Sequence, residues 1–323
     1  ETKFILVIHN DPLNLKGSTT IDQRKKLLSI CHKIYFVSSW VEEKFFHGLD
    51  KNFYSNYKTI YPSINRINKF PKKDKIIIFS GKLNNAKGFD KFGLAISKIL
   101  NKYPSWKAIA IGDEPRENYN FSHKNLTYTG WISQDKVLSL YNKSSITVAP
   151  SLWEEPFGRS SLEAGSRGNA VIISKRGGLP ETIREPIFLK KVDTKEIFLE
   201  IEKLILNRSL LKKIQINNFK NPLHLISNNI KIMDLHRSEI LDKRKNINVN
   251  LNKKLKILHI YNRAEKIGGR IYFISTGKKI ENGLIRLGHD VEGISDRDIL
   301  SYSSKIKGKN LLNKIFLEKT LYY

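Results

Sequence analysis

The sequence predicts an α/β protein in which Rossmann-like parallel sheets are wrapped by helices. Short apolar runs of strand length alternate along the chain with amphipathic stretches of helix length, as in parallel-sheet proteins. At 323 residues the chain is long enough for about two domains with sizeable hydrophobic cores. Its longest apolar runs fall well short of the roughly 18 residues that a membrane-spanning helix needs.

The predicted elements follow one another in two series. The first series has a strand at residues 4–8, a helix at 21–31 and a strand at 34–37. After a polar, basic hinge at 65–75, the second series begins. It has strands at 76–80, 108–111, 126–129, 146–149 and 170–174, and helices at 89–101, 134–143 and 160–167. Residues 194–241 are rich in helix-forming sequence, with few breakers besides Pro222.

The pattern restarts after a polar, basic run at residues 243–254, which we interpret as a linker. Beyond it lie a strand at 255–261, a glycine turn at Gly268 and Gly269, and a helix at 271–287. The sequence GHDVEGIS then supplies a second strand. This order predicts the opening of a nucleotide-binding βαβ unit.

The net charge of +26 suggests a nucleic acid or an anionic membrane surface as a partner. Only 14 of the 57 basic residues are arginine, whereas nucleic-acid readers favour arginine forks. We therefore expect no nucleic-acid partner, and we expect peripheral attraction to anionic lipid headgroups instead. The single cysteine, Cys31, predicts a metal-poor chain from a reducing compartment, with the thiol buried by packing.

The residues richest in chemistry lie between 150 and 183. Glu155 is expected in a loop that leaves a strand, and Glu163 on the helix that follows. Between them, Phe157 and Gly158 bring the backbone close to a ligand, and the free amides of the helix start form an anion site. The layout suits a sugar attached to a diphosphate. Spacing alone leaves open that both acids are solvated surface residues.

This stretch resembles the donor-binding signature of the retaining glycosyltransferases of family 4, which have the two-domain GT-B fold. EPFGRSSLE carries the pattern E-x7-E at Glu155 and Glu163, and GGLPETI resembles the segment that follows it in the family. Upstream, FSGKLNNAKGFDKF, AIGDEP and LTYTGWISQDKVLSLYNKSSITVAPS stand in the family's order. The ordered set is far more specific than any one of these motifs.

The resemblance implies a role for each matching residue. Glu155 would bind hydroxyls of the donor sugar and Glu163 the ribose of the nucleotide. Lys82 and Lys87 would clamp the diphosphate and stabilise the leaving group, so that no metal ion or other cofactor is needed. The family usually has arginine at the position of Lys82, and lysine keeps the charge but loses the bidentate fork. The other expected donor-binding residues are Gly81, Phe157, Gly158, Leu162, Gly177 and Gly178.

His9 is expected to face the donor from the opposite domain, because FILVIHNDP resembles the family strand that ends in a histidine. The implied domains are a remnant of the N-terminal acceptor-side domain, the nucleotide-sugar-binding domain, C-terminal helices, a linker and a second module, at residues 1–68, 69–192, 193–242, 243–254 and 255–323. We interpret the chain as a fragment of a tandem glycosyltransferase with an incomplete N-terminal domain. A permuted protein, in which the last unit completes the first, is the alternative.

The expected activity is transfer of a sugar from a nucleotide-diphosphate sugar to a lipid-linked or polysaccharide acceptor, with retention of configuration. The resemblance implies a metal-independent hexosyltransferase of cell-envelope polysaccharide synthesis, cytoplasmic and peripheral at the inner face of the membrane. Two alternatives stay open: a donor-binding module without turnover, and a nucleotide-sugar epimerase on the same fold.

Overall fold

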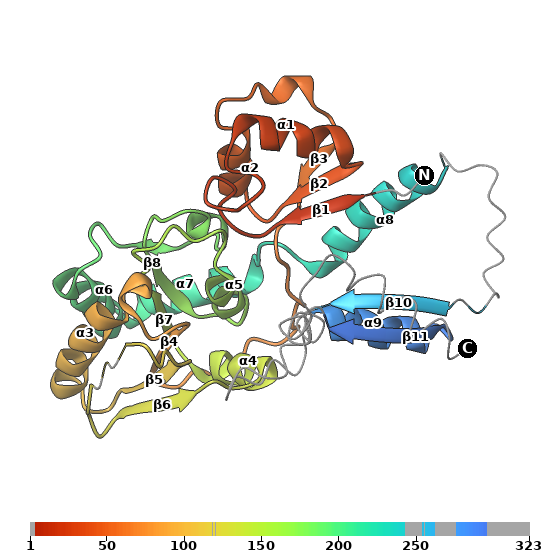
Figure 1. Cartoon of the computed structure of the whole chain (residues 1–323). Helices are drawn as coiled ribbons and strands as arrows, with labels where there is room; N and C mark the ends of the chain where they lie inside the picture. Colours follow the sequence, from red (N-terminus) through yellow and green to blue (C-terminus); the bar gives the residue numbers. More distant parts are fainter. Residues whose placement is uncertain are drawn as a thin grey trace, which may run out of the picture. The chain divides into compact units, whose positions relative to one another are not determined.

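The computed structural model describes residues 4–117, 119, 121–242, 254, 256–261 and 276–295 (Figure 1). The chain divides into two compact units, Glu1–Lys245 and Asn246–Tyr323. The first unit contains two parallel sheets with helices packed on them. The α/β class with parallel sheets wrapped by helices is therefore confirmed.

The smaller sheet of the first unit has three parallel strands in the order β1-β2-β3. Its elements are β1 (Ile5–Ile8), α1 (Ile21–Ile30), β2 (Lys33–Phe36), α2 (Ser39–Phe46), the 3-10 turn η1 (Lys51–Phe53) and β3 (Tyr57–Thr59). Helix α1 begins at a capping box, in which Thr20 and Gln23 satisfy each other's backbone amides. Phe36 and Phe45 centre the core between the sheet and α2.

The larger sheet has six parallel strands in the order β6-β5-β4-β7-β8-β9. Its strands are β4 (Ile76–Ser80), β5 (Lys107–Ile111), β6 (Leu126–Gly130), β7 (Ile146–Ala149), β8 (Ala170–Ile173) and β9 (Ile187–Phe188). Its helices are η2 (Asn85–Lys87), α3 (Phe89–Lys102), α4 (Gln134–Lys143), α5 (Arg159–Ser166), η3 (Leu179–Glu181), α6 (Thr194–Leu206) and α7 (Arg208–Lys220). The strand order reverses between β4 and β7, and ligands bind at such switch points, beyond the carboxyl ends of the strands.

Helix α8 (Ile226–Asp242) follows the larger sheet in sequence but contacts the smaller one. The Tyr35 hydroxyl on β2 lies 3.0 Å from Nδ1 of His236, and the two rings stack. The chain passes between the two sheets twice, before β4 and before α8. A parallel β-bridge between Ile64 and Leu225 joins these two connecting segments. We call residues 4–61 with α8 the three-stranded lobe, and residues 76–220 the six-stranded lobe.

Most predicted elements are confirmed, and β4, β7 and α4 agree with their predicted bounds to the residue. Helix α2 and strands β3 and β9 were not predicted from the sequence. None of the helices in the described ranges is long and apolar enough to cross a bilayer. Cys31 is buried, as predicted, and burial raises the pKa of its thiol.

The second unit contains the parallel pair β10 (Lys256–Tyr261) and β11 (Asp290–Ser295), with α9 (Thr276–Arg286) between them. The predicted strand, helix and strand are confirmed. The predicted glycine turn at Gly268 and Gly269, and the linker apart from residue 254, lie outside the described residues. The subdivision into five domains, the incomplete N-terminal domain and the tandem arrangement stay predictions.

Candidate active site between the lobes

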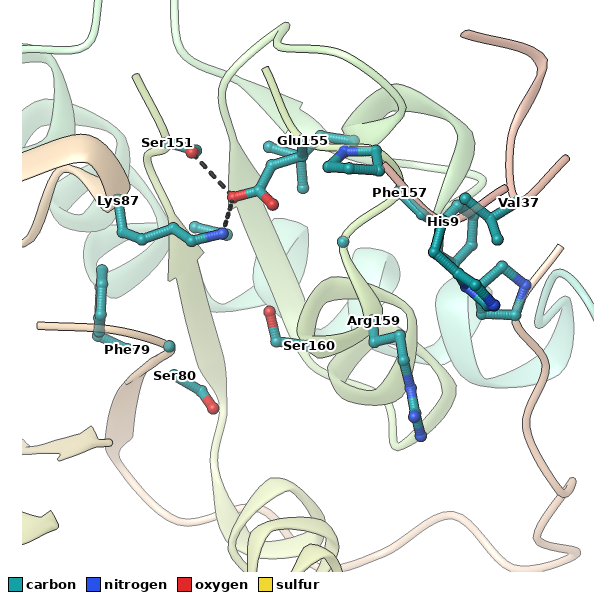
Figure 2. Close-up of a pocket in the computed structure, with 16 residues that line it drawn as sticks. His9, Val37, Phe79, Ser80, Lys87, Ser151, Glu155, Phe157, Arg159 and Ser160 are labelled. Atoms are coloured by element: carbon teal, nitrogen blue, oxygen red, sulfur yellow. Dashed lines mark hydrogen bonds and ion pairs between the residues drawn. The ribbon is translucent and has the colours of Figure 1, made fainter. Parts of the chain in front are cut away.

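A cavity of about 360 Å³ lies at the switch point of the larger sheet, and its walls come from both lobes (Figure 2). The ends of β4 and β7, the loop after β7 and the start of α5 form one side. The three-stranded lobe supplies His9 and Val37, and Pro62 comes from the segment that joins the lobes. The other lining residues are Phe79, Ser80, Gly81, Lys87, Ala149, Ser151, Glu155, Pro156, Phe157, Gly158, Arg159, Ser160 and Leu179.

Within the part of the chain that the structure describes, Glu155 is the only carboxylate that lines this cavity. One of its oxygens, Oε1, pairs with the Lys87 ammonium and accepts a hydrogen bond of 2.9 Å from the Ser151 hydroxyl, as Figure 2 shows. The glutamate is 9% exposed. Among the described residues, the structure assigns no hydrogen-bond partner to the other oxygen, Oε2. That oxygen can therefore accept a hydrogen bond from a ligand hydroxyl.

Lys87 ends the 3-10 turn η2, and the turn fixes where its ammonium lies. The Asn84 side chain accepts a hydrogen bond of 3.0 Å from the Lys87 amide. Gly88 follows with φ 70°, and a Cβ there would come within 2.1 Å of the Pro150 carbonyl oxygen. Only glycine fits this position, so the Lys-Gly pair delivers the ammonium to the end of β7.

The start of α5 is open toward the cavity. Gly158, with φ 107°, is the N-cap residue and has no side chain to cap the helix. In the described part of the chain, no acceptor is assigned to the Arg159 and Ser160 amides, whereas the Ser161 amide donates to the Gly158 carbonyl oxygen. The first two amides are consequently available to an anion, and they carry the positive end of the helix dipole. Arg159 and Ser160, the first two helical residues, line the cavity.

Glu163 lies one turn further along α5 and is 7% exposed. Its Oε1 accepts two hydrogen bonds of 3.0 Å each, from the Gln134 amide and from the Arg159 guanidinium. No partner is assigned to its Oε2 among the described residues. Glu163 does not line the cavity itself, and its contact with Gln134 joins α5 to α4.

Gly177 and Gly178 pack against the backbone beside Glu155 rather than lining the cavity. Gly178 donates its amide to the Glu155 carbonyl oxygen at 2.7 Å, and Gly177 donates its own to the Glu154 carboxylate at 2.6 Å. A Cβ on Gly177 would lie 2.1 Å from the Glu155 carbonyl oxygen. The glycine pair therefore lets two loops approach closely enough to hold Glu155 in place.

The structure separates the two predicted phosphate lysines. Lys87 lines the cavity, whereas Lys82 is exposed and outside it. Lys82 lies near Glu114, whose pKa is lowered to about 2, chiefly by the side-chain hydrogen bonds from Arg116. Leu162 is buried in the same core cluster as Phe157 and does not line the cavity.

The predicted residues His9, Gly81, Lys87, Glu155, Phe157 and Gly158 thus come together around one cavity. His9 follows the end of β1 and stands across the cavity from Lys87 and Glu155 (Figure 2). The roles of Ser151, Gln134 and Arg159 were not predicted from the sequence. The spacing of four residues between Arg159 and Glu163 on a helix is a signal that could have found this ion pair.

The described residues contain no group of three or more histidine, cysteine, aspartate or glutamate side chains placed to hold a metal ion. The site has groups that donate hydrogen bonds to an anion, namely the α5 amides and the Lys87 ammonium. Beside them lie carboxylates that can accept hydrogen bonds from hydroxyl groups. This combination suits a ligand with both phosphates and sugar hydroxyls.

Comparison with known proteins decides the family of this region. The model of the family "Glycosyl transferases group 1" matches residues 61–221. These residues form a group 1 glycosyl transferase domain. The domain covers the six-stranded lobe and therefore Lys87, Glu155, Glu163 and the open start of α5.

Curated relatives match parts of this chain. An uncharacterized glycosyltransferase of Methanocaldococcus jannaschii, MJ1607, is 31% identical over 35% of this chain and 30% of its own length. Spore coat protein SA of Bacillus subtilis is 24% identical over 56% of each chain. The serotype-specific mannosyltransferase WbdA of Escherichia coli is 28% identical over 38% of this chain and 16% of its own. The chain thus covers less than two thirds of the length of each of these relatives.

Solved structures share the fold of about three quarters of the chain. Anabaena Alr3699/HepE, crystallised with UDP-glucose, superposes with a TM-score of 0.60 at 16% identity, over 73% of this chain and 72% of that one. A glycosyltransferase from Rickettsia africae ESF-5 gives a TM-score of 0.57 at 21% identity, over 74% and 71%. The glycosyl transferase domain is accordingly part of a GT-B fold, as predicted.

Proposed function

We propose that the cavity between the lobes binds a nucleotide-diphosphate sugar, and that the protein transfers the sugar to a lipid-linked or polysaccharide acceptor. One observation carries this proposal. The Lys87 ammonium, the open start of α5 and the Glu155 carboxylate line the same cavity within a glycosyl transferase domain. HepE, which shares the fold, was crystallised with UDP-glucose, and WbdA is named a mannosyltransferase.

In this proposal the diphosphate lies against the α5 amides and Lys87, and Glu163 accepts the ribose hydroxyls. Glu155 Oε2 accepts a sugar hydroxyl, while Lys87 and Ser151 hold Oε1. The acceptor hydroxyl attacks the anomeric carbon on the face from which the diphosphate leaves, so that configuration is retained. The bond between the anomeric carbon and the phosphate oxygen of the leaving diphosphate breaks, and that oxygen takes the proton of the acceptor hydroxyl. Lys87 and the helix dipole stabilise the departing charge without a metal ion.

His9 closes the cavity from the three-stranded lobe and is proposed to orient the donor sugar or the acceptor. The lysine-rich composition supports peripheral contact with anionic lipid. A relative in the cps region of Klebsiella pneumoniae, 28% identical over 50% of this chain, supports a role in cell-envelope polysaccharide. We propose the inner face of the cytoplasmic membrane as the place of reaction.

The test is turnover of radiolabelled uridine, guanosine and adenosine diphosphate sugars, with a lipid-linked saccharide as the acceptor. Wild-type protein is expected to release the diphosphate and to label the acceptor with retained configuration. Glu155→Gln is expected to lose most of the turnover, and Asp135→Asn, an exposed acid on α4, is the control. Binding without turnover would favour a donor-binding module, and an isomerised sugar on the same nucleotide would favour an epimerase.

A further inference from the structure

Glu181, in the segment GGLPETI, extends its carboxylate to a helix of the other lobe. Its Oε2 accepts a hydrogen bond of 2.7 Å from the Ser39 amide, and its Oε1 accepts one of 2.9 Å from the Trp40 amide. These are the first two amides of α2, which have no partner within the helix itself. A negative charge at this end of a helix is also favoured by the helix dipole. Glu181 is not among the residues that line the cavity.

The same end of α2 is tied to the loop that carries Glu155. Ser38 is the N-cap of α2, and its hydroxyl donates a hydrogen bond of 2.5 Å to the Pro156 carbonyl oxygen. A Cβ on Gly178 would lie 2.6 Å from that oxygen and 3.0 Å from the Ser38 side chain. The start of α2, the Glu155 loop and the GGLPETI segment therefore meet in direct contact.

A third contact comes from the segment that leads into α8. The His224 Nε2 lies 2.7 Å from the Glu181 carbonyl oxygen, and because a carbonyl only accepts, this nitrogen carries the proton. The His224 ring stacks on Tyr61 with centroids 4.0 Å apart. Tyr61 in turn contacts Phe157, which lines the cavity, and its hydroxyl lies 2.7 Å from that of Ser39.

We infer that Glu181 is a positioning residue that joins the two lobes and sets the Glu155 loop opposite His9, without contacting the donor. This inference rests on the proposed function. The nucleotide half of the donor is proposed to bind to the six-stranded lobe alone, through α5 and Glu163. The sugar lies between His9 and Glu155 and needs both lobes. Loss of Glu181 therefore affects the sugar and not the nucleotide.

Calorimetric titration separates these two halves of the donor. Glu181→Ala removes both contacts to α2, and Glu181→Gln keeps one accepting oxygen without the charge. For Glu181→Ala we expect the affinity for the nucleoside diphosphate to stay within twofold of wild type. The extra affinity that the sugar adds, together with kcat, is expected to fall about tenfold or more. Glu181→Gln is expected to fall between Glu181→Ala and wild type.

Asp193→Ala is the matched control. Asp193 caps α6 by accepting the Glu196 amide at 2.8 Å, and it does not line the cavity. Both alanine variants lose a helix cap, and both are expected to lose thermal stability by a similar amount. Only Glu181→Ala is expected to change sugar-dependent affinity and kcat. Equal kinetics in the two variants would overturn the positioning role. So would a loss of nucleoside diphosphate affinity in Glu181→Ala as large as its loss of sugar-dependent affinity.

Hydrogen exchange without any ligand decides the role independently of the proposed function. We expect the amides of Ser39 and Trp40, and that of Gly178, which donates to the Glu155 carbonyl oxygen, to exchange at least tenfold faster in Glu181→Ala than in wild type. The Asp193→Ala variant is expected to leave these three amides unchanged. Unchanged exchange at Gly178 in Glu181→Ala would overturn the inference. A wild-type protein that binds no nucleoside diphosphate would instead overturn the proposed donor site.

Discussion

The backbone of Gly177 lies directly against the backbone of Glu155, so close that a Cβ on the glycine would come within 2.1 Å of the glutamate's carbonyl oxygen. Gly177 also has φ 56°, which favours glycine on its own account. The relationship explains why the segment after the E-x7-E pattern contains a glycine pair. It fixes the position of the Glu155 carboxylate through the main chain.

Gly177→Ala is therefore expected to displace the Glu155 loop and to abolish most sugar-dependent binding, in addition to destabilising the fold by more than about 1 kcal/mol. Gly17→Ala is the matched control, because Gly17 has φ 96° but open space around its Cβ position. Calorimetry and urea unfolding of both variants separate two effects of alanine: the strain of a positive φ, which both variants have, and the steric clash of the Cβ, which only Gly177→Ala has. Equal effects of the two substitutions would contradict the close approach.

The two phosphate lysines are expected to behave differently, because only Lys87 lines the cavity. Lys87→Met removes a cation that pairs with Glu155, and we expect turnover to fall about a hundredfold. Lys82→Met removes an exposed charge, and we expect a fall of less than about threefold. Steady-state kinetics with the donor measure both. A larger loss of turnover in Lys82→Met than in Lys87→Met would mean that Lys82, and not Lys87, contacts the diphosphate.

The two donors to Glu163 are expected to contribute unequally to nucleotide binding. Gln134→Leu removes a neutral hydrogen bond, and we expect nucleoside diphosphate affinity to fall about threefold. Arg159→Leu removes a hydrogen bond and a cation next to the α5 amides, and we expect a fall of about twentyfold. Titration of each variant measures the change. A greater loss of affinity in Gln134→Leu than in Arg159→Leu would contradict this order. It would mean that the orientation of Glu163 matters more for nucleotide binding than the positive charge of Arg159.

The strands of the larger sheet were predictable because they are continuous apolar runs bounded by polar residues, as at Ile76–Ser80 and Ile146–Ala149. Helix α2 was not, because it has two turns and takes part of its cap from Glu181, 142 residues away. Strands β3 and β9 have three and two residues, too few to show alternation.

The candidate site divides in the same way. The E-x7-E spacing, the Lys-Gly turn and the glycine pair are local patterns that the sequence displays. Which lysine lines the cavity depends on a turn of 3-10 helix, since Lys82 and Lys87 are only five residues apart. The contact between Gln134 and Glu163 joins different helices, α4 and α5, and depends on how they pack.

Lys73 predicts a pH dependence of stability. Its ammonium is partly buried and donates to the carbonyl oxygens of Tyr141 and Arg167. This burial lowers the pKa of Lys73 to about 7, with Lys212 and Arg167 adding to the shift. Between pH 7 and pH 10 the unfolded chain binds more protons at this site than the folded one. The contribution of Lys73 therefore becomes more favourable as pH rises, by up to about 1.4 kcal/mol per pH unit.

Lys73→Met is expected to remove this dependence. Urea unfolding of both proteins at pH 7, 8 and 9 gives the difference in unfolding free energy at each pH. We expect wild type to gain stability relative to the variant as pH increases. A difference that is the same at all three pH values would contradict a lowered pKa for Lys73.

The central claim is that the glycosyl transferase domain holds a nucleotide-diphosphate site built on α5. The most direct measurement is calorimetric titration of the purified chain with uridine, guanosine and adenosine diphosphates, beside Glu163→Gln and the control Asp135→Asn. We predict preference for one diphosphate in wild type and in Asp135→Asn, with at least a tenfold loss of affinity in Glu163→Gln. Binding that is equally strong in Glu163→Gln, or no binding by wild type, would contradict the account.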